Sequence, residues 1–311
     1  MALYIMMDIF QKPGTTYGQF FVVIGAALIS FSPVFVVLSG VSASTSAFYR
    51  MALSLPPLLI LVVLFKAKLW QGRRKFGIAL LCSIAYTLDL SSWHQSILLI
   101  GPGLATILGN FQVFVLAFYS IIVFHTRVNA RIIFAIPVSI IGLFLICRPG
   151  IEGGSDGFLI GIILALSTAI WYGSYVLLLR SLQVTFDMSG KIANLCMISI
   201  LTTIITGVIV IGTGNSFSVP GIDSWIYLSG YAVICQVVAW VLISAGLLYT
   251  TPIKVGLILL LQPAGAFIWD ILIFRLPFTS VTLLGVLLTL GAIYLGSTSD
   301  SSPIPQAKTD E

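Results

Sequence analysis

Apolar runs of about twenty residues recur along this chain, and they restrict its fold more than any other feature. A run of this length crosses the hydrocarbon core of a membrane as a helix, because a helix satisfies all of its backbone hydrogen bonds internally. Of the 311 residues, 59% are hydrophobic and only 8% are charged, too few charges to cover the surface of a soluble protein of this length. The sequence therefore predicts an all-α integral membrane protein.

Ten apolar segments are long enough to be membrane spans, and most of the connections between them are short. We expect a cytoplasmic N-terminus over 1–18, a first five-helix repeat over 19–147, a linker over 148–157, a second five-helix repeat over 158–298 and a disordered cytoplasmic tail over 299–311. The predicted spans cover 19–39, 43–65, 76–99, 102–124, 131–147, 158–180, 191–213, 225–247, 251–274 and 279–298.

Positive charge is distributed unevenly between the two sets of loops that this segmentation creates. One set, which includes both termini, holds twelve Lys and Arg residues, and the other holds only Arg148 and Arg275. Cytoplasmic loops carry the excess of positive charge, so both termini are predicted to be cytoplasmic. The twelve are Lys12, Lys66, Lys68, Arg73, Arg74, Lys75, Arg127, Arg131, Arg180, Lys191, Lys254 and Lys308.

The two halves of the chain also share a weak repeat. GPGLATILGNFQ at 101–112 aligns with TTPIKVGLILLLQ at 250–262, so that Gln112 falls on Gln262. Each repeat contains five spans. Because five is an odd number, the second repeat must have the opposite orientation in the membrane. Inverted repeats of this kind occur in secondary transporters, with the solute site between the halves.

Ten spans, a five-plus-five repeat, FYRMAL around Arg50 and LLLQPAGAFIWDILIF around Gln262 resemble the drug/metabolite transporter superfamily. The most similar branch is the EamA-type ten-helix transporters, which include aromatic amino acid exporters. The resemblance implies two inverted five-helix halves that work by alternating access, with helices 1, 3, 4, 6, 8 and 9 around a central cavity. The resemblance also implies that the protein lies in a cell membrane, and we expect this to be the inner membrane of a bacterium.

Arg50, Asp89 and His94 lie well inside the predicted spans, where a lone charge costs at least about 2.5–3.5 kcal/mol. Arg50 and Asp89 lie at similar depths on consecutive spans, which is compatible either with a structural ion pair or with a gating or substrate-binding role. His94 could relay protons across the membrane, or it could simply be hydrogen-bonded inside the bundle.

Amide and aromatic side chains interrupt the apolar spans near mid-depth. The amides either bind polar groups of a solute or join helices through hydrogen bonds. The aromatic residues either line the cavity, where they suit a flat or partly apolar solute, or pack in the core. The residues predicted to line the cavity are Tyr86, Trp93, Asn110, Gln112, Trp171, Tyr175, Gln236, Trp240 and Gln262.

The sequence favours a transporter over an enzyme, because it carries no phosphate-binding glycine loop, nucleophile elbow or metal-ligand spacing. We therefore expect no catalytic residue, no metal and no cofactor, and we expect a small-molecule substrate and the lipid bilayer as partners, without nucleic acid. Two alternatives remain: an intramembrane lipid-acting enzyme that uses Asp89 and His94, and a non-transporting membrane scaffold. The substrate, the direction and coupling of transport, and the oligomeric state stay open.

Overall fold

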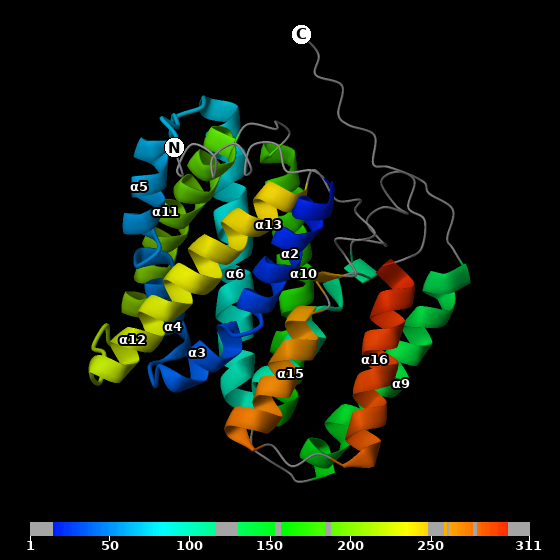
Figure 1. The fold of residues 1–311 in the computed structure, drawn as a ribbon. Coiled ribbons are helices and arrows are strands. Elements are labelled where there is room, and N and C mark those ends of the chain that lie inside the picture. The colour runs from blue at the N-terminus through cyan, green and yellow to red at the C-terminus, as the bar shows by residue number, and fades with distance from the viewer. Residues whose placement is uncertain are drawn as a thin grey trace.

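The computed structural model describes residues 15–112, 114–115, 130–152, 157–183, 188–247, 258–259, 261–275 and 279–297. Within these ranges every regular element is helical (Figure 1). The helices are α2 (Thr15–Ile29), α3 (Ser32–Leu38), α4 (Ala43–Ala52), α5 (Leu55–Leu64), α6 (Arg73–Ile100), α7 (Pro102–Gly109), α9 (Ala130–Glu152), α10 (Phe158–Leu182), α11 (Met188–Gly212), α12 (Ile222–Gly230), the π-helix η1 (Tyr231–Val238), α13 (Ala239–Leu247), α15 (Leu261–Phe274) and α16 (Ser280–Ser297).

Six helical segments of the described chain are long and apolar enough to cross a membrane. They correspond to predicted spans 1, 2, 3, 6, 7 and 8, and shorter apolar helices lie in predicted spans 5, 9 and 10. The part of span 4 that follows α7 lies mostly outside the described residues, so the count of ten spans stays a prediction. The six segments are Gly18–Leu38, Ala43–Leu64, Arg73–Ile100, Phe158–Leu179, Met188–Gly212 and Ile222–Gly246.

Helix α9 runs past the predicted end of the fifth span. Helix α9 continues to Glu152 instead of ending at Cys147, so it occupies the first half of the predicted linker over 148–157. Pro149 does not end the helix, because proline removes one backbone hydrogen bond and the neighbouring turns can still keep the helix continuous.

Two of the spans are broken near their middle, and proline with serine explains both breaks. Pro33 opens α3 after α2 has ended at Ile29, and Pro56 opens α5 in the same way after α4. Proline removes a backbone donor and so leaves a carbonyl of the preceding turn without its partner. Ser30 and Ser54 donate hydroxyl hydrogen bonds of 2.7 Å to the carbonyls of Ala27 and Met51 in those preceding turns, so each break carries an added side-chain hydrogen bond to the backbone.

The helices pack in pairs. The most extensive contacts join α6 to α10, α9 to α16, α2 to α13, α4 to α11 and α7 to α15. Figure 1 shows α9 and α16 side by side at one edge of the molecule, and the start of α2 and the end of α16 at the same end of the bundle. The largest apolar core lies between α4, α5, α6, α10 and α11 and includes Met51, Leu90 and Tyr175.

Apolar side chains also cover the outside of the bundle. Val63, Ile211 and Phe134 are each at least 70% exposed, whereas Arg50, Asp89 and His94 are buried. A surface this apolar suits lipid chains, and the polar residues face inward as expected of a membrane bundle.

Small residues set the spacing of the α9–α16 pair. A Cβ added at Gly142 would lie 2.7 Å from the carbonyl oxygen of Gly285, because the two backbones approach closely there. We expect Gly142→Ala to destabilise the protein by about 1–3 kcal/mol through overpacking, seen as a lower midpoint of thermal unfolding in detergent.

The matched control for this substitution is Gly291→Ala on α16, where an added Cβ meets nothing within 4 Å. It should leave the midpoint unchanged or raise it slightly, since alanine favours a helix over glycine. Equal midpoints for the two variants would contradict the close packing at Gly142.

Candidate functional site

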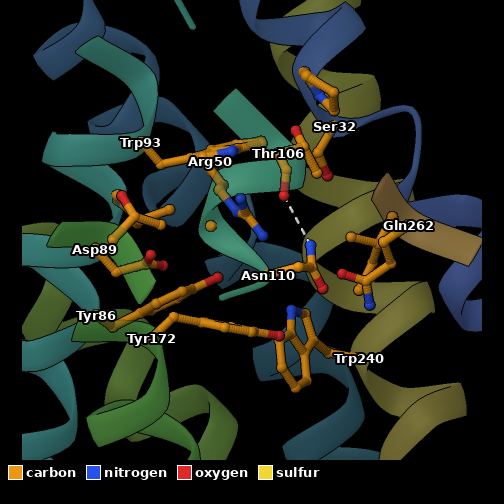
Figure 2. A pocket seen from close by; sticks show the side chains of 15 residues that line it. Ser32, Arg50, Tyr86, Asp89, Trp93, Thr106, Asn110, Tyr172, Trp240 and Gln262 are labelled. Carbon is orange, nitrogen blue, oxygen red and sulfur yellow. Dashed lines mark hydrogen bonds between the residues drawn. The ribbon is translucent and has the colours of Figure 1, made fainter. Parts of the chain in front are cut away.

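A cavity of about 70 Å³ lies inside the bundle, where broken helices and short helices meet. It is bounded by the α2–α3 break, the last turn of α4, the middle of α6 and α10, the end of α7 and the beginnings of α13 and α15. Figure 2 shows Arg50, Tyr86, Tyr172 and Asn110 directed toward a common centre. The lining residues are Ile29, Ser32, Pro33, Arg50, Tyr86, Asp89, Leu90, Trp93, Thr106, Gly109, Asn110, Thr168, Tyr172, Trp240 and Gln262.

Arg50 on α4 is only 5% exposed, and neutral groups hold its guanidinium. Its Nε donates a 2.8 Å hydrogen bond to Oε1 of Gln236, and its Nη1 donates to the hydroxyl of Tyr231. Its Cζ also lies 4.6 Å from the ring centroid of Tyr231 and 5.7 Å from that of Tyr86. The charge is therefore stabilised by oxygen dipoles and by the π faces of two tyrosines.

This network continues to Tyr86 and His94. The Tyr86 hydroxyl donates to Oε1 of Gln236 at 2.8 Å, so one amide oxygen accepts from two helices. Nδ1 of His94 lies 2.6 Å from the carbonyl oxygen of Leu90, and Nε2 lies 3.2 Å from the Tyr231 hydroxyl. Because a carbonyl only accepts, we assign the proton to Nδ1, and Nε2 then accepts from Tyr231. His94 is thus a neutral, fully buried member of the Arg50 network.

The π-helical geometry of η1 allows Tyr231 and Gln236 to contact the same guanidinium. The two residues are five positions apart, which an α-helix of 3.6 residues per turn would place about 140° apart around its axis. The wider turn of a π-helix, with its hydrogen bonds from i to i+5, brings such positions onto one side. The unusual backbone of η1 is therefore the local feature that positions both partners of Arg50.

Asp89 lies on α6, faces the same cavity and is 6% exposed. None of its oxygens lies within 4.0 Å of an Arg50 nitrogen, so the ion pair considered from the sequence is not formed in this structure. The physical reason is that Gln236 and Tyr231 hold the guanidinium on the η1 side.

Aromatic rings form the walls on the α6 and α10 side of the cavity. Tyr86 stacks on Tyr175 with ring centroids 4.4 Å apart and an interplanar angle of 13°. Tyr175 in turn meets Trp240 edge to face at 6.0 Å. Tyr86, Tyr172 and Trp240 reach the cavity, and Tyr175 supports them from behind.

The structure brings together some of the residues predicted for the site and separates others. Tyr86, Trp93, Asn110, Trp240 and Gln262 line the cavity, together with Arg50 and Asp89. Gln112, Trp171, Tyr175, Gln236 and His94 do not line it. Gln236 and His94 bind within the Arg50 network instead, and Oε1 of Gln112 is buried without a hydrogen-bond partner.

Sequence reasoning missed the face of α10 that lines the cavity. That face carries Thr168 and Tyr172, not the predicted Trp171. The two pairs 167/171 and 168/172 both combine a hydroxyl with an aromatic residue at i, i+4 spacing, so the residue types alone did not distinguish the faces. Thr106, one turn before Asn110, was also missed, and it accepts a 2.8 Å hydrogen bond from Asn110 through its carbonyl.

A second group of contacts joins α15 to the start of α7 and to the α2–α3 break. Oδ2 of the buried Asp270 accepts a 2.7 Å hydrogen bond from the backbone N–H of Gly103, at the N-terminus of α7. Trp269 stacks on Phe31 at 4.3 Å, and its Nε1 donates to the Ser30 hydroxyl at 3.0 Å. Three elements that border the cavity are therefore tied together beside it.

No cluster suited to a metal ion occurs in the part of the chain that the structure describes, because no three His, Cys, Asp or Glu side chains gather there. The chemistry that the described cavity offers is recognition: one cation, one carboxylate, amides, hydroxyls and aromatic faces.

Residues 159–298 match the EamA-like transporter family. A solved structure described only as "Crystal structure of protein" is 11% identical, covers 90% of this chain and 98% of its own, and superposes with a TM-score of 0.64. At that identity the likeness concerns the fold alone. A search of curated proteins finds no match.

The Arg50 network generates a test with two tyrosines. Tyr231→Phe removes the hydroxyl between Arg50 and His94 and leaves two buried polar groups unsatisfied, at a cost of about 1–3 kcal/mol. We expect a clearly lower midpoint of thermal unfolding. In the control Tyr49→Phe, the lost hydroxyl makes a single exposed hydrogen bond to the Phe217 carbonyl, and the midpoint should barely move. A larger effect at Tyr49 than at Tyr231 would refute the network's role in stability.

Proposed function

We propose that this protein is a secondary transporter that moves a small organic metabolite, an amino-acid-like or aromatic, amphipathic solute, across the membrane by alternating access. It works as an exporter in the inner membrane of a bacterium, with both termini in the cytoplasm. The match of residues 159–298 to the EamA-like transporter family supports the transporter class. By functional analogy with the aromatic amino acid exporters that the sequence resembles, the aromatic cavity wall suits an aromatic solute.

The observation that carries the proposal is the cavity itself. Its lining combines Arg50, Asp89, Asn110 and Gln262 with aromatic rings, at a depth where polar groups are costly unless they have a function or a partner. Both halves of the chain contribute to it, from Ile29 to Asn110 and from Thr168 to Gln262. A site between two halves is the arrangement that alternating access requires.

The helix pairing supports an inverted repeat. Exchanging predicted spans 1–5 with spans 6–10 turns the α6–α10 pair into the α13–α2 pair. The same exchange maps α4–α11, α7–α15 and α9–α16 onto themselves. The five most extensive packing pairs are therefore unchanged by the exchange, as a two-fold relation between the halves would require.

The size of the cavity supports a conformational cycle. Sites for organic ligands usually measure about 300–1,000 Å³, and this one measures about 70 Å³. We therefore interpret this arrangement as a closed state, in which Asp270 and Trp269 hold α15 against α7 and the α2–α3 break. Loading a metabolite requires those contacts, or their counterparts at the other end, to separate.

The enzyme and scaffold alternatives have less support. A lipid-acting enzyme would need Asp89 and His94 together in a cleft open to the bilayer. Asp89 instead faces the central cavity, and His94 is fully buried. A scaffold would leave no reason for a charged and aromatic cavity between the halves. Proton relay by His94 stays a prediction, and it would require the Tyr231 and Leu90 hydrogen bonds to open.

Two glutamines provide a matched test of the cavity. Gln262→Leu removes an amide that lines it, and Gln112→Leu removes an amide of the same burial, 9% exposed in both cases, that does not. In proteoliposomes loaded with a solute that the wild type moves, we expect Gln262→Leu to reduce the transport rate about two- to tenfold. Gln112→Leu should transport at close to the wild-type rate.

The proteoliposomes must contain equal amounts of each variant. Each variant must also be monodisperse in detergent, which shows that it is folded. If both variants keep the wild-type rate, the cavity is not the solute path. If the wild type moves no metabolite from a broad panel under any imposed gradient, the transporter proposal fails.

A further inference from the structure

The connection between α5 and α6 carries the densest positive charge of the chain, and Figure 1 shows it at one end of the bundle. Five cations and no carboxylate occur over residues 66–75. All five side chains are exposed, and none of them forms an ion pair with a described residue. Their charge is therefore available to a partner outside the bundle. The five are Lys66, Lys68, Arg73, Arg74 and Lys75.

Successive side chains just before α6 alternate between the core and the outside. Ala67 and Leu69 pack against the largest apolar core, whereas Lys68 and Trp70 are exposed, Trp70 by 60%. The outer side of this connection thus combines cations with an indole ring. Tryptophan and basic residues gather together at the boundary between a membrane and water, where the ring meets the headgroup region.

A small pocket between the start of α6 and α11 lies beside these charges. Nζ of Lys75 donates a 2.8 Å hydrogen bond to Oε1 of Gln71, and Nε2 of Gln71 donates one of 3.3 Å to Oδ1 of Asn194. Asn194 is buried and in turn donates to the carbonyl of Leu182. Three hydrogen bonds in series therefore hold one cation at the pocket. The lining residues are Leu69, Trp70, Gln71, Lys75, Phe76, Ala79, Asn194 and Met197.

Apolar groups accompany the cations on the pocket and on the adjoining helices. The rings of Trp70 and Phe76 pack with centroids 5.5 Å apart and form one wall of the pocket. On the helices that the connection joins, Val63 of α5 is 75% exposed and Leu81 of α6 is 54% exposed. Such surfaces contact lipid chains. A molecule with an anionic head and apolar tails would thus find cations at the ends of these helices and apolar side chains along them.

The position of the charges does not serve the stability of α6. Arg73, Arg74 and Lys75 occupy its first turn, which holds no acidic residue, and Gly72 at the N-cap provides no side-chain hydrogen bond. Cations are unfavourable at this end of a helix, because the peptide dipoles already give it a partial positive charge. Loop cations can serve only to orient the chain in the membrane, but that role requires neither the ordered Lys75 nor the aromatic pair beside it.

We propose that residues 66–76 and the pocket between α6 and α11 form a binding site for the headgroup of an anionic phospholipid. The lipid phosphate contacts Lys75 and the neighbouring cations, and Trp70 and Phe76 pack against the glycerol and upper acyl region. Charge complementarity selects an anionic lipid over a phosphatidylcholine, whose choline would bring a positive charge toward the five cations. The site lies outside the central cavity and does not depend on the proposed transport function.

The first experiment measures lipid binding to the purified wild-type protein in detergent by native mass spectrometry. The probes are phosphatidylglycerol and phosphatidylcholine with identical acyl chains, and glycerol phosphate as the headgroup without its tails. We expect phosphatidylglycerol to bind about tenfold or more tightly than phosphatidylcholine, because several cations attract its net charge. Glycerol phosphate should also bind at least about tenfold more weakly than phosphatidylglycerol, because it has no apolar part to pack on the aromatic pair.

A matched pair of variants then tests the place of binding. Lys75→Gln removes the cation that the pocket holds, and Arg275→Gln removes an exposed cation at the end of α15 that does not line the pocket. We expect Lys75→Gln to reduce the preference for phosphatidylglycerol about fivefold, since one basic residue near an anionic headgroup contributes about that factor. Arg275→Gln should keep the preference within about twofold of the wild type.

Photochemical labelling locates the site in the wild type without any substitution. A phosphatidylglycerol with a photoreactive group in its headgroup should label peptides within 66–79 or around Asn194, and excess unlabelled phosphatidylglycerol should suppress this labelling.

Four results would each overturn the proposal. They are equal binding of the two phospholipids, binding of glycerol phosphate as tight as that of phosphatidylglycerol, an equal loss of preference in the two variants, and labelling confined to other parts of the chain.

Discussion

The buried guanidinium of Arg50 is the interaction on which the interior of this protein depends. It sits inside a membrane bundle with no carboxylate within 4.0 Å among the described residues, and neutral oxygens and tyrosine rings stabilise it. Those partners come from α6 and η1, so one side chain of α4 joins three elements. The π-helical turn of η1 makes this possible, because it brings Tyr231 and Gln236 to the same side. The arrangement leaves one edge of the guanidinium directed at the cavity, where it can bind a ligand.

The membrane determines how the rest of the bundle surrounds that centre. Backbone groups must be satisfied within the protein, and the two proline breaks are accordingly accompanied by Ser30 and Ser54, whose hydroxyls bind the preceding turns. The α2–α3 break contributes Ser32 and Pro33 to the cavity. Close glycine contacts hold α9 and α16 together at the edge of the molecule, away from the cavity. Closely packed helix pairs therefore surround a small polar centre.

Sequence reasoning reached much of this architecture and missed particular parts for identifiable reasons. Apolar length alone predicted six of the spans now seen as long helices, because the bilayer sets that length. Mid-span polarity predicted Asn110, Trp240 and Gln262 in the cavity lining. It did not predict Thr168 and Tyr172, because α10 is apolar on several sides and its rotation depends on packing against α6. It could not foresee that Gln236 would bind Arg50, because the sequence gives no sign that η1 departs from the α-helix.

Alternating access of the Arg50 cavity is the central claim, and cysteine accessibility tests it most directly. Asn110→Cys would be placed in a protein whose four native cysteines are replaced by alanine, and sealed vesicles of known orientation would be exposed to a small membrane-impermeant thiol reagent from either side. The account predicts labelling from both sides, and slower labelling from both when a transported solute is present. Labelling from one side only under all conditions, or no labelling at all, would contradict it.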